Sequence, residues 1–473
     1  MTRTPALQAF WARTGVLGTN RRTRRAGRFQ TDAVAKRRFS TRKPAARRST
    51  GRFSSFTGAA AVRFPGPDVA RGFMLLLIAL ANVPVWLTFF HHNPAPDALA
   101  EGWVLLRGAL VDLRSFPLFA MLFGFGLATM SRRRMDAAVQ QTAAALPAGI
   151  DGALRAQQLE EARAAALVDS RRLLRRRGWW MLLFGAAHGA VFPGEIIGTY
   201  AVIAVLLAGV IAARRWWVMV AVSAGVCLVN LVSFLNLGSF MNTLAGEDGG
   251  AGAGGAGVLG QELAGATLSP LYPVLSLEMW AIGTLLAVLV SLAIPATCLG
   301  VWLADTELVR RPDTHRRALA VGGVLALTVG ALGSVPFDLL VQGRTLAQWL
   351  AVPSMAIYSF TGLVGAAGWL ALLLAWAGSG AGGPLRGLRW LLAAVGKRSM
   401  TVYIGQTVLF ALVFGAWLAS GVQGVSEVTG ALVAVGVWTA LALGCAWMER
   451  MGFARGPLEV LLRRAVTTSA RAR

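Results

Sequence analysis

The chain alternates between long runs of apolar residues and short polar segments. Stretches such as 216–241 and 318–337 contain no charged residue at all. A membrane-spanning helix needs about 20 apolar residues, and a chain in lipid satisfies its backbone polar groups only within helices or closed barrels. Because the apolar runs are continuous rather than alternating with polar residues, they predict helices and not barrel strands.

Ten such runs predict an all-α fold, a polytopic integral membrane helical bundle with about ten transmembrane helices. A hydrophilic loop, 131–178, separates the second run from the third and should be partly helical. A loop rich in Gly and Ala, 238–275, separates the fifth from the sixth. The transmembrane domain is therefore expected at 66–465. The predicted spans are 69–90, 113–130, 179–192, 196–213, 216–237, 279–303, 319–340, 349–376, 400–418 and 428–448.

Arginine and lysine gather in every second loop, which predicts the orientation of the chain. The basic segments are 1–65, 131–178, 214–215, 310–317, 386–398 and 450–473. The segments poor in basic residues are 91–112, 193–195, 238–275, 341–348 and 421–427. Cytoplasmic loops carry the excess of positive charge. We therefore expect a multi-pass protein of the plasma membrane with both termini in the cytoplasm.

Composition and charge agree with a lipid environment. The 473 residues are 55% hydrophobic and 14% charged, against about a quarter charged in an average soluble domain. The net charge of +24 is spread between the apolar runs, so the lipid bilayer is the expected partner and nucleic acid is not. Residues 1–65 hold sixteen Arg or Lys and one acid, Asp32, which predicts a basic disordered cytoplasmic tail. Residues 466–473 are expected to form a basic C-terminal tail.

Ionisable residues in or near the predicted spans are candidates for chemistry, because burying them in lipid is costly. Asp68 and Arg71 lie three residues apart at the start of the first span. Arg71 could bind a phosphate or carboxylate, oriented by Asp68, or the two could form an intrahelical ion pair that anchors the span.

His188 lies in an apolar run, about 14 Å along a helix from Trp179, and could act as a general base. Glu195 follows seven residues later, but Pro193 and Gly194 indicate that it folds back. The alternative is a histidine hydrogen-bonded to a neighbouring helix.

Two other features predict structure rather than chemistry. The stretch Gly124-Phe125-Gly126 favours close helix packing and not a nucleotide-binding loop, since no strand precedes it and no P-loop lysine follows. Asp338 closes the seventh span near the outer surface and needs no special role there.

Several stretches, in order along the chain, together form a recognisable pattern. They are Asp68 to Gly72 with Asn82, Phe116 to Gly126, Leu183 to Gly189 with Gly194 to Ile196 and Tyr200, Gly396 to Gln406, and Gly456 to Glu459. These stretches resemble motifs of the YeiB-like family of bacterial membrane proteins, the domain of unknown function 418. Glu195 stands where the family usually has Asp, and Phe192-Pro193 replaces a more usual aromatic pair.

These motifs are also distantly similar to transmembrane acyltransferases such as heparan-α-glucosaminide N-acetyltransferase. That resemblance implies an acyltransferase-like enzyme in which a cytoplasmic acyl-CoA, as co-substrate, donates to a small-molecule, lipid or sugar acceptor at the outer face. No bound cofactor and no metal ligand are expected. The implied catalytic residues are His188 and Glu195; the implied substrate-binding residues are Asp68, Arg71, Asn82, Tyr200, Arg398, Tyr403 and Gln406.

Other interpretations of the same residues stay open. Arg398 could anchor the ninth span at the cytoplasmic surface, while Tyr403 and Gln406 could make ordinary interhelical hydrogen bonds. A secondary transporter would use the same polar groups to bind substrate and couple protons, although no inverted repeat is visible. A membrane scaffold without catalytic activity would have no need of them.

Overall fold

The computed structural model describes residues 64–90, 92–248, 270–380 and 383–471, with side chains omitted for 243–248. All regular elements in these ranges are helices. They belong to one compact unit, Val62–Arg473. The predicted disordered tail, 1–65, lies outside the described residues except for its last two, and so does most of the Gly- and Ala-rich loop.

The helices are α2 (Pro65–Leu87), α3 (Ala98–Leu110), α4 (Ser115–Ala145), α5 (Gly152–Gly189), α6 (Ile197–Ala212), α7 (Trp216–Asp248), α9 (Tyr272–Val290), α10 (Ala293–Asp305), α11 (Glu307–Arg310), α12 (Arg316–Val341), α13 (Gln348–Ala351), α14 (Ser354–Ala377), α15 (Gly387–Gly396), α16 (Ser399–Ala419), α17 (Glu427–Arg450) and α18 (Pro457–Arg471).

Within the described residues, eight helical segments are long and apolar enough to cross a membrane, which confirms the all-α polytopic fold. Two of the ten predicted spans are not among them. The run 179–192 falls at the end of α5, a 38-residue helix whose earlier part is highly charged. The run 196–213 forms α6, which has only 16 residues and is mostly buried.

Two predicted spans are interrupted, and proline contributes in both cases. The expected helix 279–303 is two helices, α9 and α10, broken at Ser291 and Leu292. The Ser291 hydroxyl accepts a hydrogen bond from the Ala293 N–H, and Pro295 is tolerated in the first turn of α10 because it needs no donor there. The expected helix 349–376 instead begins at Ser354, directly after Pro353.

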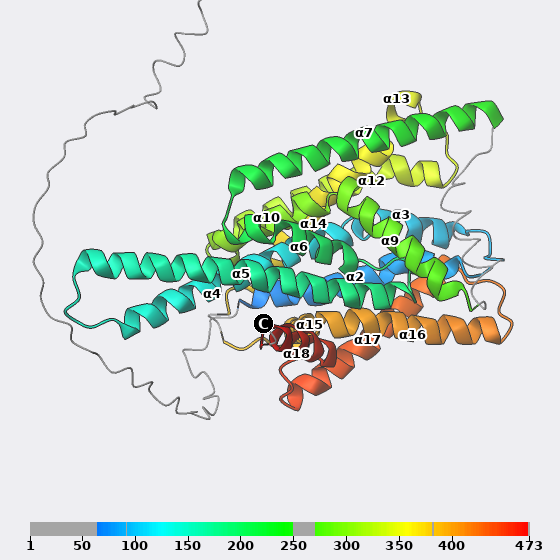
Figure 1. The fold of residues 1–473 in the computed structure, drawn as a ribbon. Coiled ribbons are helices and arrows are strands. Elements are labelled where there is room, and N and C mark those ends of the chain that lie inside the picture. Colours follow the sequence, from blue (N-terminus) through cyan, green and yellow to red (C-terminus); the bar gives the residue numbers. More distant parts are fainter. Residues whose placement is uncertain (1–63, 91, 249–269, 381–382, 472–473) are drawn as a thin grey trace, which may run out of the picture. The chain divides into compact units, whose positions relative to one another are not determined.

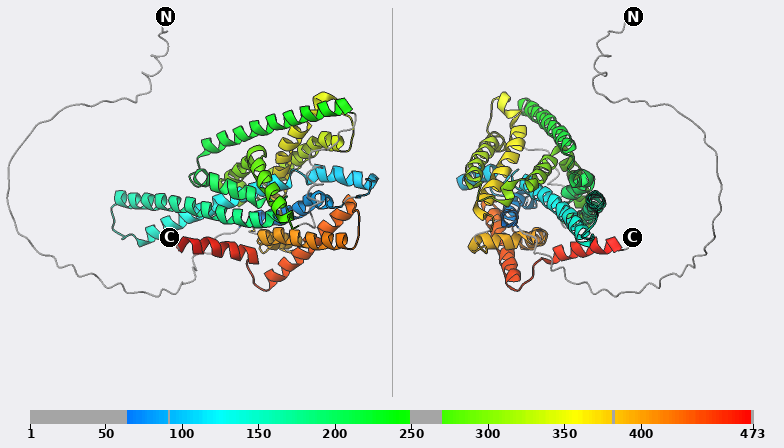
Figure 2. Two further views of the ribbon diagram at one scale, coloured as in Figure 1. Left: turned by 45° about the vertical axis from the view of Figure 1, so that its right-hand side comes forward. Right: turned by 90° about the vertical axis from the view of Figure 1, so that its left-hand side faces the viewer.

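Two segments assigned to loop or tail contain more helix than expected. Residues 131–145 continue α4 and 152–178 belong to α5, so the two helices form a hairpin that extends beyond the other described helices (Figures 1 and 2). The expected tail from 466 onward is helical as far as Arg471, at the end of α18. The apolar residues Leu462 and Val466 of α18 are buried against the bundle, which holds this segment as a helix.

Helix α2 lies at the centre of the contact network. It packs against α4, α14, α15, α16 and α17, while α6 packs against α5. Helix α7 differs, because many of its large apolar side chains are exposed, Trp217 and Val220 among them. Such a surface suits lipid better than water, and the segment Trp216–Asn242 is one of the eight that are long and apolar enough to cross a membrane.

Glycines let the central helices approach backbone to backbone. A Cβ atom on Gly72 of α2 would overlap the Leu392 carbonyl of α15, and one on Gly396 would overlap the Asp68 carbonyl. Gly124 of α4 and Gly300 of α10 meet the facing helix in the same way. The predicted close packing at Gly124 is therefore confirmed.

Candidate functional site

A cavity of about 320 Å³ lies where the first turns of α2 and α16 meet α4, α5 and α18. We call it the basic cavity, because three cationic side chains line it against two carboxylates. Most of its other lining residues are apolar, with Ser399 and Tyr403 as further polar groups. The charged lining residues are Asp68, Arg71, Arg177, Lys397 and Glu459.

Arg71 is held in place at the wall of the basic cavity. Its Nη1 donates to Asp68 Oδ1 over 3.1 Å, and its Nη2 donates to the Leu122 carbonyl over 3.2 Å. The i, i+3 ion pair expected from the sequence is therefore present. Both alternatives remain compatible with this geometry, since the pair anchors α2 and also points a guanidinium at the cavity.

Arg177, at the end of the charged part of α5, was not identified from the sequence. Its Nε is buried and has no hydrogen-bond partner among the described residues. Burial first, and then the charge of Arg71, lower the pKa of the Arg177 guanidinium. A bound anion would offset both effects, because its charge would stabilise the two guanidinium groups.

Lys397 and Arg398 are adjacent, but only Lys397 lines the basic cavity. The Arg398 side chain is completely buried and donates to Glu449, to the Ala394 carbonyl and to the Phe453 carbonyl. Arg398 thus ties α16 to the end of α17. Lys397 also contacts Glu449, at 2.6 Å. The sequence held a signal for Lys397, since it occupies the basic position that follows the glycine of the 396–406 motif.

Glu195 folds back toward His188, as the proline and glycine before it indicated. Its carboxylate accepts hydrogen bonds from the N–H groups of Ile197 and Gly198 at the start of α6, the latter over 2.9 Å. It also accepts one from Trp280 Nε1 over 2.7 Å. The negative charge therefore lies at a helix N-terminus, which stabilises it.

His188 is buried between Glu195 and α16. Its Nδ1 lies 3.8 Å from Glu195 Oε1, beyond hydrogen-bond distance, and its Nε2 lies 2.8 Å from Thr407 Oγ1. The Tyr403 ring packs edge-on against the imidazole, with 5.2 Å between centroids. Since Tyr403 also lines the basic cavity, it is the residue that joins this cavity to His188.

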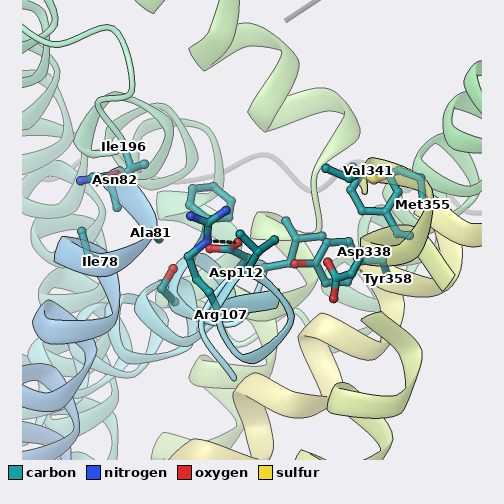
Figure 3. Close-up of a pocket in the computed structure, with 15 residues that line it drawn as sticks. Ile78, Ala81, Asn82, Arg107, Asp112, Ile196, Asp338, Val341, Met355 and Tyr358 are labelled. Atoms are coloured by element: carbon teal, nitrogen blue, oxygen red, sulfur yellow. Dashed lines mark hydrogen bonds and ion pairs between the residues drawn. The ribbon is translucent and has the colours of Figure 1, made fainter. Parts of the chain in front are cut away.

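A second cavity, of about 380 Å³, lies near the opposite end of α2 (Figure 3). We call it the acidic cavity. Asn82 lines it, and by helix geometry Asn82 is about 16 Å along α2 from Arg71. Ile196 lines the acidic cavity while Ile197 lines the basic one. The backbone that follows Glu195 therefore separates the two cavities.

Tyr200 and Gln406 make helix-to-helix contacts and line neither cavity. The Tyr200 hydroxyl donates to the Phe116 carbonyl over 2.9 Å, and Gln406 Nε2 donates to the Leu75 carbonyl over 2.8 Å. Of the nine residues expected at the site, the structure places Asp68, Arg71 and Tyr403 on the basic cavity and His188 with Glu195 beside it.

The acidic cavity is also lined by charged residues that the sequence did not predict as site residues. Arg107 donates to Asp112 over 2.8 Å and to Glu427 over 2.6 Å, and Asp338 lines the same cavity. The Arg107–Asp112 pair lies between the α2 side and the Asp338 side of the cavity (Figure 3). Three separate helices, α3, α17 and α12, carry Arg107, Glu427 and Asp338, so no local pattern in the sequence joins these three residues.

Residues 303–469 match the model of a family described as "Protein of unknown function (DUF418)". The DUF418 match supports the family part of the resemblance, and it covers Asp338 on α12, Lys397 in the turn before α16, and Tyr403 on α16. The resembling motifs between 68 and 200 lie outside it. The comparisons with curated proteins and with solved structures found no match.

Proposed function

We propose that this protein is an acyltransferase-like membrane enzyme of the YeiB-like type. In this proposal it transfers an acyl group from a cytoplasmic acyl-CoA to an acceptor at the outer face of the membrane. The observation that carries the proposal is the pair of cavities on either side of the backbone at 196–197, with His188 and Glu195 buried beside that backbone.

The basic cavity would take the acyl donor. Arg71, Arg177 and Lys397 present three positive charges in one small space, and arginine binds phosphate through paired charge-assisted hydrogen bonds. With the orientation expected from the loop charges, this cavity faces the cytoplasm, where acyl-CoA is found.

In this proposal His188 would be the general base that takes the proton of the acceptor group. The proton would be accepted by Nε2, which lies 2.8 Å from Thr407 Oγ1, while Nδ1 faces the Glu195 carboxylate at 3.8 Å. An acceptor O–H or N–H would attack the thioester carbonyl, forming a C–O or C–N bond. The acceptor proton passes to His188 and the C–S bond of the thioester breaks. The CoA thiolate then leaves and takes the proton from His188, which returns the imidazole to its neutral form. Glu195 would stabilise the imidazolium.

The test is label transfer from acetyl-CoA radiolabelled in its acetyl group. Membranes containing the wild-type protein should transfer label to lipid, sugar or protein acceptors, and the His188→Ala variant should lose most of it. His315→Ala is the matched control, because His315 lies in the short loop before α12 and outside both cavities. Wild-type membranes that transfer no label would refute the enzyme.

A secondary transporter is the second candidate, and one observation favours it. Two cavities near opposite ends of α2, separated by a short stretch of backbone, could open a site between them to each side of the membrane in turn, as alternating access requires. Vesicles would then take up substrate in a proton-gradient-dependent way without transferring label. The two functions are thus separated by two measurements on one preparation.

A further inference from the structure

The acidic cavity contains more carboxylates than cations. Arg107 is paired with both Asp112 and Glu427. The remaining arginine of the cluster, Arg114, is fully buried beside it, and the remaining carboxylate is Asp338. Two arginines thus face three carboxylates, so the ionised cluster carries one negative charge in excess.

Arg114 makes no ion pair with Asp338. Its guanidinium donates to three carbonyl oxygens, those of Gly108, Asp112 and Gly330, and it packs over the Tyr358 ring with Cζ 5.2 Å from the centroid. These bonds tie the α3–α4 junction to α12, which is a structural role. Leu113, next to it, has a φ of 53°, an uncommon backbone conformation for a leucine that the surrounding contacts must hold.

Asp338 is therefore left with an unmatched oxygen. The residue is 7% exposed, and its Oδ2 is buried without a hydrogen-bond partner in the described part of the chain. Gly108 leaves the space for this carboxylate, since a Cβ there would overlap both of its oxygens. A buried charge of this kind is costly unless something pairs with it.

The other residues that line the acidic cavity indicate which kind of ligand could pair with Asp338. Apolar side chains form most of it, with Asn82, Ser115 and Tyr358 as further polar groups. A volume of about 380 Å³ holds a small organic molecule and more than a single ion. The apolar lining residues include Val104, Phe116, Phe337, Val341 and Met355.

We propose that the acidic cavity is a binding site for a small cationic amine with an apolar body, whose ammonium group pairs with Asp338. The ammonium supplies the missing positive charge and a donor for Oδ2, while the apolar body contacts the Phe and Val side chains. Under the proposed function this ligand would be the acceptor, but the site itself does not depend on acyl transfer.

Benzylamine and benzyl alcohol are matched probes, since they share shape and differ in charge at neutral pH. Binding to the purified full-length protein in detergent is measured by calorimetry. The wild type should bind benzylamine about tenfold more tightly than benzyl alcohol, a difference of about 1.4 kcal/mol. In Asp338→Asn the ratio should fall to about one, while Asp338→Glu should keep a preference for the amine.

Glu101→Gln is the control, because it removes a carboxylate from exposed surface on α3 and should leave the ratio unchanged. Equal binding of the two probes by the wild type would overturn the proposal, and this comparison needs no variant to fold. A preference that survives in Asp338→Asn would overturn it as well. Since the readout is binding, failure here leaves the label-transfer test of the enzyme intact.

Discussion

At the scale of single residues, small side chains decide how closely the helices approach. Gly124 and Gly126 lie two apart in one motif, yet they have different surroundings. A Cβ on Gly124 would overlap the Thr297 carbonyl of α10, whereas one on Gly126 would lie 3.4 Å from Arg71 Nη2. The Thr297 carbonyl belongs to the backbone of a packed helix, so it cannot move aside without separating the two helices. The distance to Arg71 Nη2 is an ordinary van der Waals contact.

Gly124→Ala should therefore destabilise the protein, by about 2 kcal/mol for a forced separation of packed helices. Gly126→Ala is the matched control and should be close to neutral. Thermal unfolding of both variants in the same detergent measures the difference. Equal melting temperatures for the two variants would contradict the close approach of α4 and α10.

Arg177 supports a second prediction at this scale. Replacing it by Gln in the basic cavity should weaken the binding of coenzyme A about tenfold, because one charge-assisted phosphate contact is lost. Arg172→Gln removes an arginine whose side chain is 72% exposed on the same helix, and should leave affinity unchanged. Calorimetric titration of both variants checks this, and equal losses would count against a donor site at Arg177.

At the scale of elements, α18 completes the start of α16. Glu459 of α18 accepts hydrogen bonds from the N–H groups of Met400 and Thr401, over 2.7 and 3.2 Å, and from the Thr401 hydroxyl. Orphan N–H groups of a first turn need such acceptors. The motif at 396–406 thus supplies the N–H groups at the start of α16, and the motif at 456–459 supplies the carboxylate that caps them.

Glu459→Ala should lower stability by about 1 kcal/mol, the usual effect of losing a helix cap, and should loosen α18. Limited proteolysis in the segment 451–456, which joins α17 to α18, should become faster. Glu160→Ala, on the exposed surface of α5, is the control for removing a glutamate. An unchanged cleavage rate in Glu459→Ala would show that other contacts hold α18 in place.

At the scale of the whole molecule, the charges of the loops predict on which side of the membrane each turn between helices lies. The turn between α4 and α5 should be cytoplasmic, and the turn between α16 and α17 should lie outside. Both turns have exposed residues suited to labelling, Ala148 in the first and Gln423 in the second.

Single cysteines at these two positions, with the three native cysteines replaced, test the threading. A membrane-impermeant maleimide should label Gln423→Cys in intact cells and Ala148→Cys only after permeabilisation. The carboxyl end, after α18, should behave like Ala148. Labelling of both positions from the same side would refute the predicted orientation, and the assignment of the basic cavity to the cytoplasm with it.

The sequence by itself determined the features that depend on neighbours along the chain. Continuous apolar runs predicted the helices, a proline and a glycine predicted the turn that brings Glu195 back, and i, i+3 spacing predicted the Arg71–Asp68 pair. Each depends on local backbone geometry. The apolar runs did not predict the helix breaks near Pro295 and Pro353. A single proline can interrupt a helix inside a long apolar run, and the apolar composition of the run does not reveal the break.

Only the tertiary structure decided which way each side chain faces inside the bundle. In lipid a helix can be apolar all round, so hydrophobic periodicity does not reveal its buried face. Lys397 and Arg398 are neighbours in the turn between α15 and α16 and both contact Glu449, yet only Lys397 lines the basic cavity. Asp338 gained its place beside Gly108 from the packing of α12 on α3, a contact between residues 230 positions apart that no local pattern encodes.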